Sequence, residues 1–200
     1  MNYTGPKVRL SRKLGLELTQ KAAKYTSKKG YPPGQHGNTK KRAKMSDYGR
    51  QLLEKQRLRM QYNVSERQLR NYFAKAAGMT GNTGEILVQL LESRLDAIVY
   101  RSGFTRSIYA ARQMVTHGHV NVGGKRVSIP SYHVSANQVV SLVDKMKKNE
   151  IVQDCIRSTA PPTYLEVGKA DFSSKFLYLP PREEIPTVCE ISLVVEFYSR

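Results

Sequence analysis

Hydrophobic residues recur at helical spacing through the segment that follows residue 45. Ser46 is a suitable N-cap for a helix from Asp47 to about Tyr62, and Asp47 is favourably placed against the helix dipole. Ser65 and Gln68 have the spacing of a capping box, which predicts the start of a second helix. The residues expected to be buried by these two helices are Tyr48, Leu52, Leu53, Leu58, Met60, Leu69, Tyr72, Phe73 and Ala76.

The helical pattern continues beyond these two helices. Further helices are expected at Glu85–Glu92, at Arg94–Ser102 with Ser93 as its N-cap, from Thr105 or Ser107 to Thr116, and near Lys148–Arg157. Gly78, Gly103 and Gly118 follow three of the predicted helices, where glycine commonly ends a helix.

Between His119 and Ser128 the hydrophobic period changes from that of a helix to that of a strand. Polar and apolar residues alternate on both sides of Gly123-Gly124, and glycine supplies the positive φ that both positions of a two-residue hairpin turn need. A last apolar element, Val188–Tyr198, is expected to pack against the early helices. Further strands are expected at Val139–Val143, Tyr164–Val167 and Lys175–Leu179.

Residues 1–45 are basic and have few apolar positions, with 12 basic residues and one acid, Glu17. Residues 28–37 have the glycine and proline density of an irregular loop. We expect an extended arm with a short helix around Ser11–Lys24. Such an arm would be mobile in solution, because it buries too little apolar surface to offset the entropy lost on ordering.

The whole chain carries 33 Lys and Arg against 16 Asp and Glu, a net charge of +17. Residues 1–75 account for net +15 and residues 76–200 for net +2. Such asymmetry indicates a nucleic-acid or an anionic membrane partner. The basic stretch lacks an amphipathic face with apolar anchors, and the chain has neither a membrane-spanning apolar run nor a signal-peptide core. Nucleic acid is therefore the expected partner, and no membrane.

Residue types that carry catalysis or bind metals are sparse. Cys155 and Cys189 form no CxxC pair, and His117 and His119 have no third ligand close in sequence, so we expect no metal and no cofactor. Glu183-Glu184 is a solvated acidic pair in a proline-rich loop. An enzyme is therefore disfavoured.

The helix pair and hairpin at residues 94–128 predict a basic, hydrogen-bonding edge. Thr105-Arg106-Ser107 opens a helix, and the amides and positive dipole end of a helix N-terminus suit a phosphate. The remaining residues of this edge are Arg112, His117, His119, Asn121, Lys125 and Arg126. We interpret the edge as an RNA-binding surface, with a solvated helix face and a routine turn as the alternative.

A second basic surface follows the two earlier helices. Its candidate RNA contacts are Arg50, Lys55, Arg57, Arg59 and Arg67, and the alternative is a solvated basic face. Tyr48, Tyr62 and Tyr109 are candidates for stacking on bases. Helical spacing also places Tyr48 in the core.

Several segments resemble a known family. Ser93-Arg94-Leu95-Asp96, Tyr100-Arg101-Ser102-Gly103, Ala111-Arg112-Gln113 and residues 117–122 resemble the S-four RNA-binding module, which occurs in ribosomal proteins, pseudouridine synthases and some tRNA synthetases. Residues 31–37, 46–52, 90–96, 129–132 and 195–200 are similar to the ribosomal protein S-four family itself, of the bacterial type without zinc cysteines. The resemblance covers nearly the whole chain.

This resemblance implies a cytoplasmic structural constituent of the small ribosomal subunit. Such a protein binds the 5′ domain of 16S rRNA, nucleates subunit assembly and contributes to translational accuracy. The implied partners are 16S rRNA, ribosomal protein S-five, neighbouring small-subunit proteins, mRNA near its path into the subunit, and the mRNA of its own operon. Some members bind zinc through four cysteines of the N-terminal arm, but residues 1–45 contain no cysteine. The remaining candidate RNA contacts are His36, Lys40, Lys41, Arg42 and Arg94.

The expected fold is of the α+β class. It comprises a basic extension at residues 1–45, a helical domain at 46–92 joined by 178–200, and an S-four-type RNA-binding domain at 93–177 with two helices and an antiparallel sheet. An enzyme built on this module would need a second, catalytic domain. A regulator of mRNA or DNA is the other alternative, since the helix pair at 94–116 superficially imitates a helix-turn-helix. The hairpin and the basic arm favour RNA.

Overall fold

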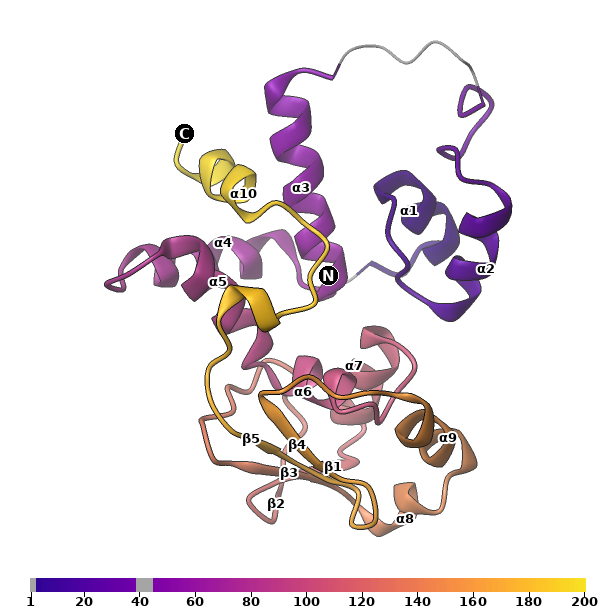
Figure 1. The fold of residues 1–200 in the computed structure, drawn as a ribbon, viewed down its shortest axis with the longest axis vertical. Coiled ribbons are helices and arrows are strands. Elements are labelled where there is room, and N and C mark those ends of the chain that lie inside the picture. The colour runs from indigo at the N-terminus through magenta and orange to yellow at the C-terminus, as the bar shows by residue number, and fades with distance from the viewer. Residues whose placement is uncertain (1–2, 39–44) are drawn as a thin grey trace. The chain divides into compact units, whose positions relative to one another are not determined.

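The computed structural model describes residues 3–38 and 45–200, which form two compact units (Figure 1). The first unit contains the described residues up to Gly84 together with Thr187–Arg200, and the second is Glu85–Pro186. The first unit is helical, whereas the second combines helices with an antiparallel sheet. The expected α+β class is confirmed.

The N-terminal part of the first unit is helical and is not an extended arm. Helix α1 (Lys7–Leu14) ends at Gly15, whose φ of +66° is left-handed, and α2 (Gln20–Lys28) begins after Thr19, whose side chain accepts a hydrogen bond from a first-turn amide. The prediction of one helix at Ser11–Lys24 is wrong, because a stop and a start signal lie within that range. The buried apolar residues here are Leu14, Leu16, Leu18 and Ala22.

Helices α3 (Asp47–Gln61) and α10 (Ile191–Tyr198) pack against each other in the first unit. The Ser46 hydroxyl accepts a hydrogen bond from a first-turn amide at 3.2 Å, as predicted for the N-cap of α3. The side-chain amide of Gln51 donates to the Glu196 carboxylate at 2.8 Å, which joins the two helices. The predicted packing of the last element on an early helix is confirmed.

The buried face of α3 differs from the expected one. Leu58 and Met60 are buried as predicted, but Tyr48 exposes 52% of its surface. The polar residues Gln51, Glu54 and Lys55 are buried instead. Each of them has a polar partner in a neighbouring segment.

Helix α4 (Glu66–Ala77) begins with the predicted capping box. The Ser65 hydroxyl accepts from the Gln68 amide at 3.2 Å, and the Gln68 side chain accepts from the Ser65 amide at 3.1 Å. Gly78 follows the helix, as predicted. The ring of Phe73 stacks on Tyr198 of α10 with centroids 4.9 Å apart, so α10 contacts both α3 and α4.

Glu66, the first residue of α4, is the centre of a charged cluster. Its carboxylate accepts hydrogen bonds from Lys55 Nζ at 3.0 Å and from the Tyr198 hydroxyl at 2.8 Å, and Arg59 lies 3.6 Å away. Burial raises the pKa of Glu66, but hydrogen bonds from Lys55 and Tyr198 and attraction to Lys55 and Arg59 outweigh it and hold the pKa below its usual range. Burial and the bond to Glu66 raise the pKa of Tyr198. The cluster links α3, α4 and α10.

Helix α5 (Thr83–Glu92) leads to α6 (Leu95–Arg101) in the second unit. The prediction that Ser93 caps α6 is wrong, because its hydroxyl donates to the Gln89 carbonyl at 2.7 Å and the helix begins one residue later than expected. Arg94 occupies the N-cap position without a side-chain capping bond.

The described residues of the second unit form a five-stranded sheet in the order β2-β1-β3-β5-β4, and every neighbouring pair is antiparallel. The predicted hairpin is confirmed, and Gly123 and Gly124 have φ of +55° and +80°. The strand expected at Lys175–Leu179 begins two residues earlier. The strands are β1 (Val120–Val122), β2 (Lys125–Arg126), β3 (Val139–Leu142), β4 (Leu165–Gly168) and β5 (Ser173–Phe176).

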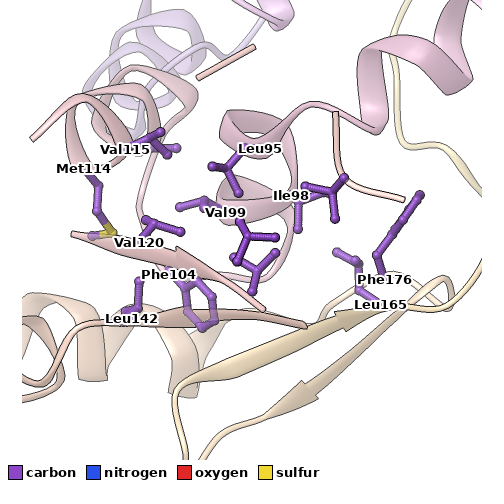
Figure 2. Packing of buried hydrophobic residues seen from close by; sticks show 14 of the residues in the cluster. Leu95, Ile98, Val99, Phe104, Met114, Val115, Val120, Leu142, Leu165 and Phe176 are labelled. Atoms are coloured by element: carbon purple, nitrogen blue, oxygen red, sulfur yellow. The ribbon is translucent and has the colours of Figure 1, made fainter. Parts of the chain in front are cut away.

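Helix α6 and helix α7 (Ile108–Thr116) cover one face of this sheet (Figure 1). Figure 2 shows their apolar side chains meeting those of the strands in one cluster, with Leu95, Ile98 and Val99 contributed by α6. Phe104 and Phe176, both fully buried, belong to the same cluster. Burial of these apolar side chains holds the helix pair on the sheet.

Tyr164, a member of this core, contacts the buried and paired carboxylate of Glu92. Glu92 is fully buried and accepts hydrogen bonds from Arg101 at 2.8 and 3.1 Å and from the Tyr164 hydroxyl at 3.1 Å. Burial and the neighbouring charge of Glu92 raise the pKa of Tyr164. Buried charges are stable in proteins when paired in this way.

Shorter helices complete the second unit. Helix α9 (Glu150–Ser158) confirms the helix predicted near Lys148–Arg157, whereas α8 (Asp144–Lys147) was not predicted. A 3-10 turn, η1 (Arg182–Glu184), follows the prolines at 180 and 181. Within residues 3–38 and 45–200, no helix is both long and apolar enough to span a membrane.

Candidate nucleic-acid interface

The N-terminus of α7 carries one exposed cation. Ser107 is the N-cap, and its hydroxyl accepts from the Ala110 amide at 3.3 Å, so one of the amides expected to meet a phosphate already has a partner. Arg106 is exposed, and its guanidinium lies 4.0 Å from the Asp154 carboxylate of α9. At that distance, with 47% of the Arg106 side chain exposed, the ion pair is weak and Arg106 can reach an external phosphate.

The other end of α7 meets the hairpin. Arg126 Nη2 donates to the His117 carbonyl at 3.1 Å, and the guanidinium lies directly over Gly118. Gly118 has a φ of +69°, which favours glycine here, whereas the guanidinium that a Cβ would meet at 2.2 Å is the end of a flexible side chain and can move aside. Arg126 and the neighbouring Lys125 are exposed. Exposed cations thus lie beside both ends of α7, a helix of nine residues and therefore about 14 Å long.

Three further residues of the expected edge surround the end of α7. His117 is exposed, and its ring centroid lies 6.0 Å from that of His119. Asn121 lies in β1 opposite Arg126 and is partly exposed. Among the described residues, no group of three or more His, Cys, Asp and Glu could hold a metal ion.

Arg94 and Arg112 lie in a buried cluster around Asp96. Arg94 donates two hydrogen bonds to the Asp96 carboxylate, at 3.0 and 2.7 Å, and both side chains are 1% exposed. Arg112 Nη1 lies 3.4 Å from the same carboxylate with 22% of its side chain exposed. Burial raises the pKa of Asp96 against the attraction of Arg94 and Arg112. Contact of Arg94 with RNA is therefore not favoured, and Arg112 can offer only part of its surface.

The basic residues of α3 and α4 also include both exposed and buried side chains. Arg50 is exposed and lies 3.6 Å from the Asp47 carboxylate, and Arg67 of α4 is exposed. Lys55 is buried against Glu66, and its Nζ lies 4.4 Å from the centre of the Phe197 ring.

Arg57 and Arg59 are partly exposed, between the exposed Arg50 and the buried Lys55. Arg57 pairs with Glu54, and its Nε donates to the Leu14 carbonyl at 2.8 Å. Arg59 donates to the Val64 carbonyl at 3.2 Å and to Gln56 at 3.0 Å. Arg50 and Arg67 are thus the cations of this surface that remain open to a polyanion.

The remaining candidate residues differ in exposure, and some lie outside the described part of the chain. His36 is exposed, whereas Lys40, Lys41 and Arg42 lie outside the described residues. Among the stacking candidates, Tyr62 is 2% exposed and cannot stack on a base without unfolding, but Tyr48 is 52% exposed. Tyr109 is half-buried on α7.

Two family models match this chain, one after the other along the sequence. Residues 2–92 match the family model described as ribosomal protein S4/S9 N-terminal domain, and residues 93–140 match that of the S4 domain. The small ribosomal subunit protein uS4 of Parabacteroides distasonis is 47% identical over 200 residues, covering 99% of this chain and 98% of the relative. That of Streptomyces avermitilis is 47% identical over 204 residues, covering 100% and 99%. The chain belongs to the uS4 family.

Membership in the uS4 family confirms the resemblance seen in the sequence. The uS4 relatives are structural ribosomal proteins, so the interpretation that the chain is not an enzyme is also confirmed. The segment that matches the S4 domain contains α6, α7 and the hairpin, and therefore all the exposed cations at the two ends of α7.

Sequence reasoning in this uS4 chain missed residues that lie beside the histidines. Gln113 and Met114 of α7 and Met146 of α8 line one hollow with His117 and His119. Gln113 could have been predicted to lie beside His117, because it is polar and stands one helical turn before it. Met146 could not, because α8 was not predicted.

Proposed function

We propose that this protein is a structural constituent of the small ribosomal subunit in the cytoplasm, and that it binds the 5′ domain of 16S rRNA directly. Binding rests on its S4 domain, with the N-terminal helical unit as a second contact surface. Affinity comes mainly from phosphate neutralisation, which releases counterions, and selectivity comes from the shape of an RNA junction.

The observation that carries this proposal is the pair of exposed basic groups at the two ends of α7. Arg106 stands at one end, and Lys125 and Arg126 stand at the other, where the Arg126 guanidinium is held by the His117 carbonyl. Cations carried by a folded helix and hairpin suit phosphates on a structured RNA better than cations on a flexible chain do. The net charge of +17 supplies long-range attraction to the same partner.

The finer roles are proposed by analogy with the uS4 family. A protein that binds rRNA directly can hold a junction in the folded form and so nucleate subunit assembly. The proposal includes contact with ribosomal protein S5 and other small-subunit proteins, a contribution to translational accuracy, and contact with mRNA on its way into the subunit. Binding to the mRNA of its own operon uses the same cationic groups.

The test is a competition at one salt concentration. A labelled 5′-domain fragment of 16S rRNA is displaced from the full chain by itself, by an unrelated folded RNA of equal length, or by duplex DNA. The proposal requires the fragment to compete far better than either alternative. Equal competition by the unrelated RNA would contradict selective rRNA binding, and better competition by duplex DNA would indicate a DNA-binding regulator.

A further inference from the structure

A small cavity lies beside the C-terminal end of α7. It has a volume of about 210 Å³ and is lined by Ala110, Gln113, Met114, His117, His119 and Met146. Sites for drug-sized molecules usually measure ~300–1,000 Å³. This cavity is open to solvent, and its volume suits one planar ring system.

The lining has the chemistry that recognises a heteroaromatic ring. His117 and His119 present two imidazole rings with centroids 6.0 Å apart, inclined at 64° to each other. Met114 and Met146 supply polarisable thioethers, which make favourable contacts with aromatic rings. Gln113 is exposed and has an amide that can both donate and accept a hydrogen bond at the edge of a base.

A cationic side chain from the hairpin lies beside His117, which lines the cavity. Arg126 donates to the carbonyl of His117, one of the residues that line the cavity, and its guanidinium lies over Gly118. Lys125 is the next residue and is exposed. A ring that entered the cavity while attached to a phosphate would thus have a cation on the neighbouring hairpin for that phosphate.

We propose that this cavity receives a single unpaired base that leaves the stack of the bound RNA. The base lies among the two imidazoles and the two thioethers, Gln113 contacts its edge, and Arg126 binds the adjoining phosphate. This inference rests on the proposed RNA-binding function and adds a site to it. Single-stranded positions with splayed bases are the usual targets of sequence-selective RNA recognition.

The first experiment titrates the full wild-type chain with 5′-AMP and, separately, with inorganic phosphate, and follows the methionine methyl signals by NMR. The methyl signals of Met114 and Met146 should shift saturably with AMP and much less with phosphate. The methyl of Met60, buried in the first unit, serves as the control and should not move. Equal shifts with AMP and phosphate, or no shift at Met114 and Met146, would overturn the proposal.

The second experiment fills the cavity. Ala110→Leu adds bulk to the lining without changing charge, and Ala136→Leu makes the same substitution at an exposed loop position. Ala110→Leu should weaken binding of the 16S rRNA 5′-domain fragment about tenfold, as expected for the loss of one stacked base, whereas Ala136→Leu should not. The AMP titration needs no variant, so it still decides the matter if Ala110→Leu impairs folding.

The experiments distinguish failure of the base site from failure of the proposed rRNA-binding function. Tight, selective rRNA binding without AMP-dependent shifts at Met114 and Met146 would leave the proposed function standing and remove the base site. AMP-dependent shifts with no preference for the rRNA fragment would keep the base site and contradict the proposed function.

Discussion

Several charged side chains of this protein bind other parts of the protein rather than facing solvent. Lys55 and Arg94 were both expected to contact RNA from their residue type, and both are buried against carboxylates. Helical periodicity shows which face a residue occupies, but it does not show that a partner from another helix, such as Glu66, will neutralise that face. Arg106 and Lys125 are exposed, and within the described part of the chain neither is buried against a carboxylate.

The Glu66 cluster makes the first unit sensitive to acid. A carboxyl whose pKa is lowered on folding adds stability that is fully present above its unfolded value of about 4.5 and is lost as pH falls through the folded pKa. Glu66→Gln should lower the free energy of unfolding by about 1–2 kcal/mol at pH 7, because buried Lys55 loses its charged partner. Urea unfolding followed against pH should show the difference from wild type shrinking below pH 4.5. A difference that stays constant to pH 3 would contradict this role.

The Asp96 cluster predicts a larger effect in the second unit. Asp96→Ala leaves the guanidinium of Arg94 buried without its carboxylate and should destabilise that unit by about 3–5 kcal/mol. Asp144→Ala is the matched control, since Asp144 pairs with Lys147 but is 90% exposed, and surface ion pairs contribute little to stability. Denaturant unfolding measures both. Similar losses for the two variants would contradict a structural role for the buried cluster.

At the scale of elements, local signals predicted the caps and the hairpin well. Ser46, the Ser65–Gln68 box and Gly123-Gly124 act through neighbours close in sequence, and all three form as predicted. The shift of β5 and the existence of α8 were missed, because they depend on pairing with distant strands and on packing. Ser93 was assigned as a cap because its residue type fits, but it bonds back to the preceding helix.

The hairpin turn yields a test of this local reasoning. Gly124 has a φ of +80°, so Gly124→Ala should cost about 1–2 kcal/mol of stability from backbone strain alone. Gly78→Ala is the control, since Gly78 has a φ of −83° and a Cβ there meets only ordinary contacts at 3.7 Å. Thermal unfolding should show a clear loss of stability for the first variant and none for the second. An unchanged Tm for Gly124→Ala would contradict the turn geometry.

The N-terminal helices differ most from the sequence-based expectation. Basic composition predicted an extended arm, but Leu14, Leu16, Leu18 and Ala22 are buried, and the Leu14 carbonyl accepts a hydrogen bond from Arg57 of α3. Four apolar residues in a basic segment form too weak a pattern to reveal a helix pair when their partner helix is unknown.

Leu14→Ala distinguishes the two descriptions of this segment. Leu14 is 3% exposed, so its truncation should cost about 2–5 kcal/mol of unfolding free energy. Val188→Ala, at a position 65% exposed in the same unit, should cost little. Urea unfolding compares the two. Equal, small effects would indicate that residues 3–38 behave as an extended arm.

For the whole molecule, composition and motifs predicted more of the fold and family than any single residue did. The α+β class and the family were predictable because they depend on many positions at once. The candidate interface was only partly predictable, because exposure decides which cations meet a polyanion and exposure depends on the tertiary fold. Above all, we propose that the exposed cations at the two ends of α7 bind rRNA phosphates.

The most direct test is the salt dependence of binding to the 16S rRNA 5′-domain fragment by Arg106→Ala/Lys125→Ala. Arg157→Ala/Lys169→Ala is the control, because it removes the same charge from exposed positions of the same unit. The first variant should lose affinity and lower the slope of log K against log salt by about 2, roughly one per phosphate contact, with an unchanged Tm. The control should keep nearly the wild-type slope. Equal slopes for the two variants would show that RNA senses only the total charge, and would contradict an interface at the ends of α7.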